Sequence, residues 1–128
     1  MFELLDVRPR QRVLDVGSGS GWTTALLAYV VGPNGVVVGT ELVPDLVEFG
    51  SANLAKYDFP WASIRQADPG TLGAPDDAPF DRILVSAEAR AIPEPLVDQL
   101  AVGGTMVLPV GAHMVLVDGH TTDPMGWL

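Results

Sequence analysis

The chain has 128 residues, 48% of them hydrophobic, and sixteen acidic against seven basic side chains give it a formal net charge of −9. This length predicts one domain with a sizeable core, and the negative charge argues against nucleic acid or an anionic membrane as a partner. The absence of cysteine excludes disulfides, iron–sulfur clusters and thiolate zinc sites, and it fits a reducing cytoplasm.

Targeting and membrane signals are also lacking in the sequence. No apolar stretch approaches the roughly twenty residues that cross a bilayer, and the first residues lack a basic region followed by a long apolar run. We therefore expect a cytoplasmic protein with no membrane partner. Residues 1–128 are expected to form a single domain in which 118–128 is an irregular tail, because that stretch has two glycines, a proline and no clear period.

The first half of the chain alternates strands and helices. A short apolar pattern in residues 1–7 is typical of the last turns of a helix. Residues 12–16 and 36–40 predict buried strands, because they are mostly apolar or β-branched. Residues 23–31 and 44–57 have the apolar spacing of helices. This alternation predicts a parallel sheet with right-handed crossovers.

The second half continues the pattern and changes it near its end. In order, we expect a weaker strand at 61–65, an irregular proline- and acid-rich stretch at 71–79, a strand at 80–86, a helix at 93–100, and strands at 105–110 and 113–117. The last two strands are close enough in sequence to form a hairpin at one end of the sheet. The predicted fold is therefore α/β, with a mostly parallel sheet, helices on both faces and one antiparallel strand at an end.

A glycine-rich turn after the first strand is the main functional signal. The sequence VLDVGSGSG places Asp15 near the end of the strand and Gly17, Gly19 and Gly21 at every second position after it. Glycine carries no Cβ and tolerates positive φ, so such a turn lets the backbone approach a bound small molecule closely. The helix that follows points its free N–H groups at the same place. The stretch predicts a nucleotide-like cofactor.

The spacing of the glycines discriminates between cofactors. A dinucleotide fingerprint needs glycines spaced G-x-G-x-x-G, but Trp22 occupies the third position, and no Walker lysine motif occurs. The pattern D-x-G-x-G-x-G instead resembles class I methyltransferases that bind S-adenosylmethionine. Glu41, at the end of the second strand, is placed to accept both ribose hydroxyls. Asp68, after the third strand, is placed to accept from the adenine amino group.

Later segments sharpen the resemblance. The segments VLDVGSGSGWTTALLAYVVG, APFDRILVSAEARAIPEPLVDQL and VGGTMVLPVG are similar to the protein-L-isoaspartate O-methyltransferase family, and the similarity covers about residues 5–118. The resemblance implies a Rossmann-like sandwich, S-adenosylmethionine as cofactor, and methyl transfer to the carboxylate of L-isoaspartyl residues in damaged proteins or peptides.

The resemblance also implies site residues. The cofactor-binding positions are Asp15, Gly17, Ser18, Gly19, Gly21, Glu41, Leu42, Asp68 and Ser86, and the positions next to the methyl acceptor are Ala87, Glu88 and Arg90. No catalytic base is assigned, because a carboxylate is already the nucleophile and catalysis is then chiefly positioning and desolvation.

The chain departs from the family at several points. Glu88 and Arg90 replace an alanine and a proline, and Pro69 replaces a glycine. Family members also carry a longer N-terminal segment with a threonine/serine substrate loop and a C-terminal extension that completes the sheet, so the chain looks shortened at both ends. Two alternatives therefore stay open. One is a methyltransferase of the same fold for a small molecule, and the other is a noncatalytic cofactor-binding remnant that dimerises through an uncovered sheet edge.

The remaining candidate residues predict no further chemistry. His113 and His120 are the only histidines, and no acid cluster adjoins them, so we expect surface or satisfied histidines and no metal site. Trp22, Trp61 and Trp127 are expected to be packing residues. Trp22 is also close enough to the glycine turn to touch a ligand.

Overall fold

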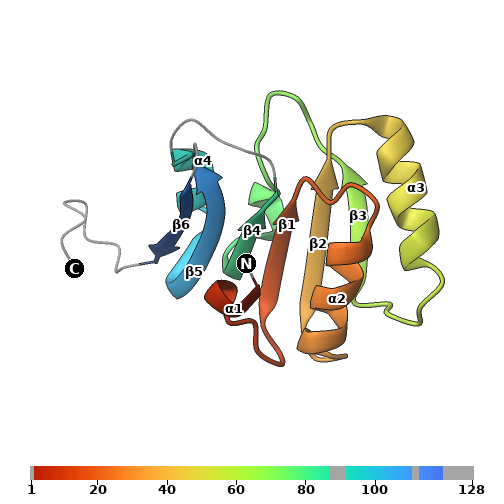
Figure 1. Cartoon of the computed structure of the whole chain (residues 1–128), viewed down its shortest axis with the longest axis horizontal. Helices are drawn as coiled ribbons and strands as arrows, with labels where there is room; N and C mark the ends of the chain where they lie inside the picture. Colours follow the sequence, from red (N-terminus) through yellow and green to blue (C-terminus); the bar gives the residue numbers. More distant parts are fainter. Residues whose placement is uncertain (1, 87–91, 111–112, 120–128) are drawn as a thin grey trace.

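The computed structural model describes residues 2–86, 92–110 and 113–119. They contain one six-stranded sheet in the order β3-β2-β1-β4-β5-β6 (Figure 1). All neighbouring strands are parallel except β5 and β6, which form the predicted antiparallel hairpin. The strands are β1 (Arg12–Val16), β2 (Val36–Glu41), β3 (Ala62–Gln66), β4 (Phe80–Val85), β5 (Leu100–Val110) and β6 (His113–Asp118).

Helices pack on both faces of this sheet, as predicted. The helices α1 (Phe2–Leu5), α2 (Trp22–Val31) and α3 (Pro44–Leu54) belong to the first half of the chain, while the short 3-10 helix η1 (Pro75–Asp77) and α4 (Glu94–Val97) belong to the second. Figure 1 shows α2 and α3 side by side over the strands β1 to β3. No helix within the described ranges is long and apolar enough to cross a membrane.

Alternation along the strands gives the sheet one core on each face. Val13 and Leu14 are both fully buried and point to opposite faces. Val13 packs with Leu27 of α2 in one cluster, and Leu14 packs with Leu96 of α4 in the other. The strand β1 therefore lies at the centre of the molecule, and the turn that follows it emerges between the two layers.

The predicted helix at 93–100 is wrong in its second half. The helix α4 ends at Val97, and Leu100 already pairs with Phe80 as the first residue of β5. The side chain of Gln99 is buried, its Nε2 donates to the carbonyl of Leu72 at 2.8 Å, and its Oε1 accepts from the N–H of Ala74 at 2.9 Å. The helix therefore ends before Gln99, and the side chain of Gln99 contacts a distant loop.

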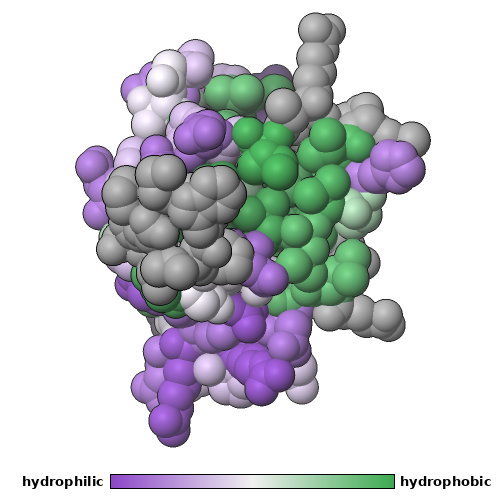
Figure 2. Space-filling view, turned by 90° about the vertical axis from the view of Figure 1, so that its left-hand side faces the viewer, coloured by the Kyte–Doolittle hydropathy of each residue, from purple (hydrophilic) through white to green (hydrophobic). Residues whose placement is uncertain are grey.

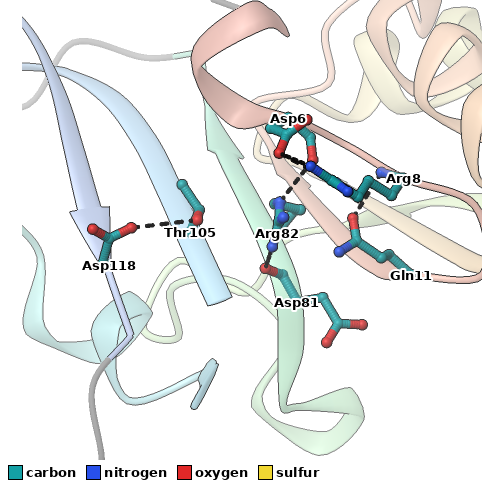
Figure 3. Close-up of polar contacts among 7 residues, drawn as sticks. All are labelled: Asp6, Arg8, Gln11, Asp81, Arg82, Thr105 and Asp118. Carbon is teal, nitrogen blue, oxygen red and sulfur yellow. Dashed lines mark hydrogen bonds and ion pairs between the residues drawn. The ribbon is translucent and has the colours of Figure 1, made fainter. Parts of the chain in front are cut away.

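Polar contacts hold the amino-terminal segment against the starts of the strands (Figure 3). The Nε of Arg82 donates to the carbonyl of Asp6 at 3.1 Å, and Arg8 forms an ion pair with the Asp6 carboxylate at 2.9 Å. The N–H of Arg12 donates to the Asp81 carboxylate at 2.9 Å. These contacts lie at the amino ends of β1 and β4, which leaves the carboxyl ends of the parallel strands for a ligand.

Candidate functional site

The glycine turn has the backbone conformation that the sequence predicts. The φ angles of Gly17, Gly19 and Gly21 are all positive, at 82°, 53° and 83°. Residues that carry a Cβ rarely adopt such angles. The N–H groups of Gly17 and Ser18 both donate to the carbonyl of Thr40, at 2.8 and 3.1 Å. These bonds fix the turn to the end of β2.

Glu41 connects the turn to the next loop. One carboxylate oxygen, Oε1, accepts from the N–H of Gly19 at 2.9 Å, and the other, Oε2, accepts from the N–H of Val43 at 3.2 Å. Each carboxylate oxygen has two lone pairs, so both keep one for a ligand. Glu41 is half-buried at the end of its strand, and it is therefore held in a fixed orientation while still reachable.

A cavity of about 350 Å³ opens beside Glu41, at the carboxyl ends of four parallel strands. This volume lies within the range of pockets that hold small molecules, about 300–1,000 Å³. Ligands of open α/β sheets bind at this edge. The cavity is lined by Val16, Gly17, Thr40, Glu41, Leu42, Ala67, Asp68, Pro69, Thr71, Leu72, Gly73 and Ser86.

The cavity brings together five of the residues predicted to bind cofactor. Gly17, Glu41, Leu42, Asp68 and Ser86 all line it, and they follow β1, β2, β3 and β4 or end one of these strands. They lie close together because the carboxyl ends of parallel strands meet at one edge of the sheet. The structure therefore brings these five predicted positions together around one cavity.

The loop after β3 supplies the part of the cavity wall that the sequence analysis missed. Thr71, Leu72 and Gly73 line the cavity, although their stretch was expected only to be irregular. Their position depends on the hydrogen bonds of Gln99 to the carbonyl of Leu72 and the N–H of Ala74. No local pattern in the sequence signals such a long-range contact.

The other predicted cofactor residues support the turn and do not line this cavity. Asp15 and Ser18 are buried, and Gly21 packs against α3, where an added Cβ would lie 2.5 Å from the carbonyl oxygen of Gly50. Gly19 contacts Glu41 through its N–H. A side chain of α3 also holds the turn, since Nδ2 of Asn53 donates to the carbonyl of Ser20 at 2.9 Å.

Asp15 has an unusual environment for a carboxylate. Its side chain is fully buried, and its Oδ2 accepts from the hydroxyl of Thr24 at 2.8 Å. Burial raises the pKa of Asp15 to about 6; the hydrogen bond from Thr24 lowers that pKa in part, and the negative charge of Glu41 raises it further. Oδ1 of Asp15 and Oγ of Ser18 are buried without a hydrogen-bond partner among the described residues.

The tryptophans differ from one another. Trp61 packs against the core and donates from Nε1 to the carbonyl of Ala28 at 2.8 Å, so its predicted packing role is confirmed. The packing prediction is wrong for Trp22, which is 58% exposed because it begins α2 on the solvent side. Trp22 lines a separate hollow of about 210 Å³ between α2 and α3.

Several sequence predictions fall outside the described residues. These are the acceptor-side positions Ala87, Glu88 and Arg90, together with His120 and Trp127. His113 is exposed at the start of β6. In the part of the chain that the structure describes, no group of three or more histidine, cysteine, aspartate or glutamate side chains is arranged to hold a metal ion.

Comparison with known proteins identifies relatives of this site and fold. A family model described as protein-L-isoaspartate(D-aspartate) O-methyltransferase matches residues 1–120. The protein-L-isoaspartate O-methyltransferase of Methanothrix thermoacetophila is 47% identical over 113 residues, which are 88% of this chain and 53% of the relative. That of Methanopyrus kandleri is 47% identical over 115 residues, which are 89% of this chain and 51% of the relative.

Solved structures agree with the sequence relatives. A protein-L-isoaspartate O-methyltransferase superposes with a TM-score of 0.84 at 26% identity, over 93% of this chain and 39% of that chain. A candidate protein-L-isoaspartate O-methyltransferase from Plasmodium falciparum, in complex with S-adenosyl-L-homocysteine, superposes with a TM-score of 0.72 at 32% identity, over 89% of this chain and 59% of that chain. The chain spans about half the length of the curated relatives it matches. It belongs to the protein-L-isoaspartate O-methyltransferase family.

Proposed function

We propose that the chain is a single cofactor-binding domain whose cavity binds S-adenosylmethionine. The observation that carries this proposal is the cavity itself, which joins the glycine turn to Glu41 and Asp68 at the carboxyl ends of the parallel strands. The residues fit the group: the cofactor is cationic and has no pyrophosphate, so it needs carboxylate and carbonyl oxygens and no phosphate cradle. The relative from Plasmodium falciparum carries the corresponding product in its structure.

Different residues of the site would contact different parts of the cofactor. Glu41 would accept from the two ribose hydroxyls with its remaining lone pairs, and Leu42 would pack beside the ribose. Asp68 would accept from the adenine amino group. Around the methionine end the proposal places the residues of the turn and of two neighbouring strands, namely Asp15, Gly17, Ser18, Gly19, Gly21 and Ser86.

Calorimetric titration with S-adenosylhomocysteine tests this proposal. We expect saturable binding by the full chain and a loss of at least tenfold in affinity for Glu41→Ala, because two charge-assisted hydrogen bonds to the ligand and the anchor of Gly19 disappear. Glu48→Ala, which changes an exposed carboxylate on α3, is the matched control and should bind as the wild type does. No binding, or equal affinity for Glu41→Ala, would contradict the proposal.

We further propose that the protein is an O-methyltransferase acting on the carboxylate of L-isoaspartyl residues. S-adenosylmethionine supplies a methyl group activated by its sulfonium when bound. A carboxylate acceptor is already the nucleophile, so this chain's residues need only orient the two partners and exclude water. The predicted acceptor-side residues Ala87, Glu88 and Arg90 lie within four residues after Ser86, which supports their placement beside the methyl donor.

An assay of labelled methyl transfer distinguishes this activity from its alternatives. We expect transfer to a peptide with an isoaspartyl residue and none to the same peptide with an ordinary aspartyl residue. Transfer only to small carboxylates would favour a small-molecule methyltransferase of this fold. Binding of cofactor without any transfer would favour a noncatalytic cofactor-binding protein.

A homodimer through the β6 end of the sheet is part of the same proposal. In the described residues β6 pairs only with β5, and its Met114 and Leu116 are more than 40% exposed. Figure 2 shows a broad hydrophobic area on this side of the molecule. Unpaired edges and apolar areas of this kind favour self-association, and sedimentation equilibrium measures it.

We keep a cytoplasmic location in the proposal on the basis of the cysteine-free composition.

A further inference from the structure

Thr24 forms a buried contact beneath the glycine turn that no cofactor assignment includes. It is the third residue of α2, it is fully buried, and its hydroxyl donates to Oδ2 of Asp15 at 2.8 Å. The helix α2 has no side-chain cap at its N-terminus, so this hydroxyl is directed at the strand below and not at the helix's own free N–H groups. The contact joins the first turn of α2 to the strand that precedes the glycine turn.

The other polar atoms at this place have no partner. Oδ1 of Asp15 and Oγ of Ser18 are buried, and neither forms a hydrogen bond with the described residues. A Cβ added to Gly39, the β2 residue in register with Asp15, would lie 3.0 Å from Oγ1 of Thr24 and 3.2 Å from Cβ of Ser18. Buried polar atoms are rarely left unpaired, so this cluster is a place where a ligand or a bridging water completes the hydrogen bonding.

We propose that Thr24 is a positioning residue of the cofactor site: its hydroxyl fixes Oδ2 of Asp15 and keeps the carboxylate charge beneath the turn, where Oδ1 stabilises the cationic methionine end of the cofactor through a bridging water. This inference rests on the proposed binding of S-adenosylmethionine. It gives Asp15 an electrostatic role from below the turn, consistent with its absence from the cavity wall. The role of Thr24 is to orient that charge.

The surroundings of Asp15 make this arrangement sensitive to pH. Burial raises the pKa of Asp15 to about 6, the hydrogen bond from Thr24 lowers it in part, and Glu41, at the end of β2, raises it. The helix α2 above it carries no charged residue, and the register neighbours on β2 and β4 are Gly39 and Leu84. A bound cation favours the ionised carboxylate, so cofactor and proton compete near pH 6.

Affinity for S-adenosylmethionine, which carries the sulfonium charge, between pH 5 and 8.5 tests the role of Thr24. For the wild type we expect affinity to fall below about pH 6, approaching tenfold per pH unit for one competing proton. Thr24→Val keeps the shape of the side chain and removes the donor, so the midpoint of this fall should move to higher pH and the loss of affinity should be largest near neutral pH. Thr24→Ser restores the hydroxyl and should restore the wild-type profile.

The neighbouring half-buried Thr23 provides the matched control. Thr23→Val makes the same chemical change one residue away on α2 and should leave both affinity and pH profile unchanged. A Thr24→Val profile that superposes on the wild type would overturn the inference. A uniform loss of affinity at every pH would overturn it as well, since that pattern indicates a packing role only.

A measurement on the wild-type chain keeps the inference testable if Thr24→Val does not fold. Titration with S-adenosylmethionine at pH 6, in buffers of different ionisation enthalpy, should show net release of a fraction of a proton. This release should fall to zero at pH 8 and be lost in Asp15→Asn. Binding without proton release at pH 6 would overturn the inference while leaving cofactor binding intact. Absence of any binding by the wild type would overturn the cofactor proposal itself.

Discussion

Asp15 and Glu41 are carboxylates of neighbouring strands that do different work because their environments differ. Glu41 is half-buried and accepts two backbone N–H groups while lining the cavity. Asp15 is fully buried and receives one hydrogen bond, from Thr24. An ionised carboxylate that is buried with only one hydrogen bond lowers the stability of the fold. Retaining it is understandable if the charge serves ligand binding.

The burial of Asp15 predicts a gain in stability for Asp15→Asn. The pKa of Asp15 is about 6 in the folded chain against an ordinary 3.8, so its contribution to stability is fully present below about pH 4 and is lost as the pH rises through 6. Asp15→Asn should therefore raise the free energy of unfolding at pH 8 by on the order of 2 kcal/mol and have little effect at pH 4. Urea unfolding at the two pH values measures this, and an equal change at both would contradict the account.

The types of residue and their order in the sequence were enough to predict which residues stand at the ends of the strands. Contacts between distant elements could not be predicted in this way. Gly17 and Glu41 were predictable because glycine spacing and a strand followed by an acid are local patterns. Thr24 was not singled out, because a threonine in the first turn of a helix gains meaning only when the helix packs over Asp15. Gln99 was placed in a helix for the same reason: two of its partners, Leu72 and Ala74, lie more than twenty residues away.

At the scale of elements, the site depends on how loops and helices are fastened to the strands. The glycine turn is held by β2 through the carbonyl of Thr40 and by α3 through Asn53. The loop after β3 is held by Gln99, between α4 and β5. The cavity wall opposite the turn therefore depends on a side chain outside the cavity.

This dependence predicts that Gln99→Ala impairs both stability and binding. The substitution leaves the N–H of buried Ala74 and the partly buried carbonyl of Leu72 without their side-chain partner, which should cost about 1–3 kcal/mol of folding free energy. Affinity for S-adenosylhomocysteine should fall several-fold because Leu72 and Gly73 line the cavity. Urea unfolding and calorimetry measure the two effects.

Gln11→Ala is the control for this prediction. Gln11 accepts a hydrogen bond from the N–H of Arg8 at the opposite edge of the sheet, so its loss should leave affinity for S-adenosylhomocysteine unchanged. A Gln99→Ala protein that binds as tightly as the wild type would show that the loop keeps its position without this anchor.

For the molecule as a whole, the two ends of the parallel strands differ in what they contact. Polar contacts at the amino ends of the strands hold the N-terminal segment in place (Figure 3), and the cavity opens at the carboxyl ends. The parallel sheet and the antiparallel β6 were predictable from the alternation of elements and a short connection, whereas the order of the strands was not predicted. The early end of α4 was not predictable, because Leu100 already pairs with Phe80, a residue distant in the sequence.

We propose that the glycine turn and the carboxyl ends of the parallel strands together form the cofactor site. Backbone amide shifts in an NMR titration with S-adenosylhomocysteine test that claim most directly. We predict the largest shifts at Gly17, Gly19, Glu41, Asp68 and Ser86. Shifts confined to Tyr57, Phe59 and Ile64 in the groove between α3 and β3, or no shifts at saturating ligand, would contradict it.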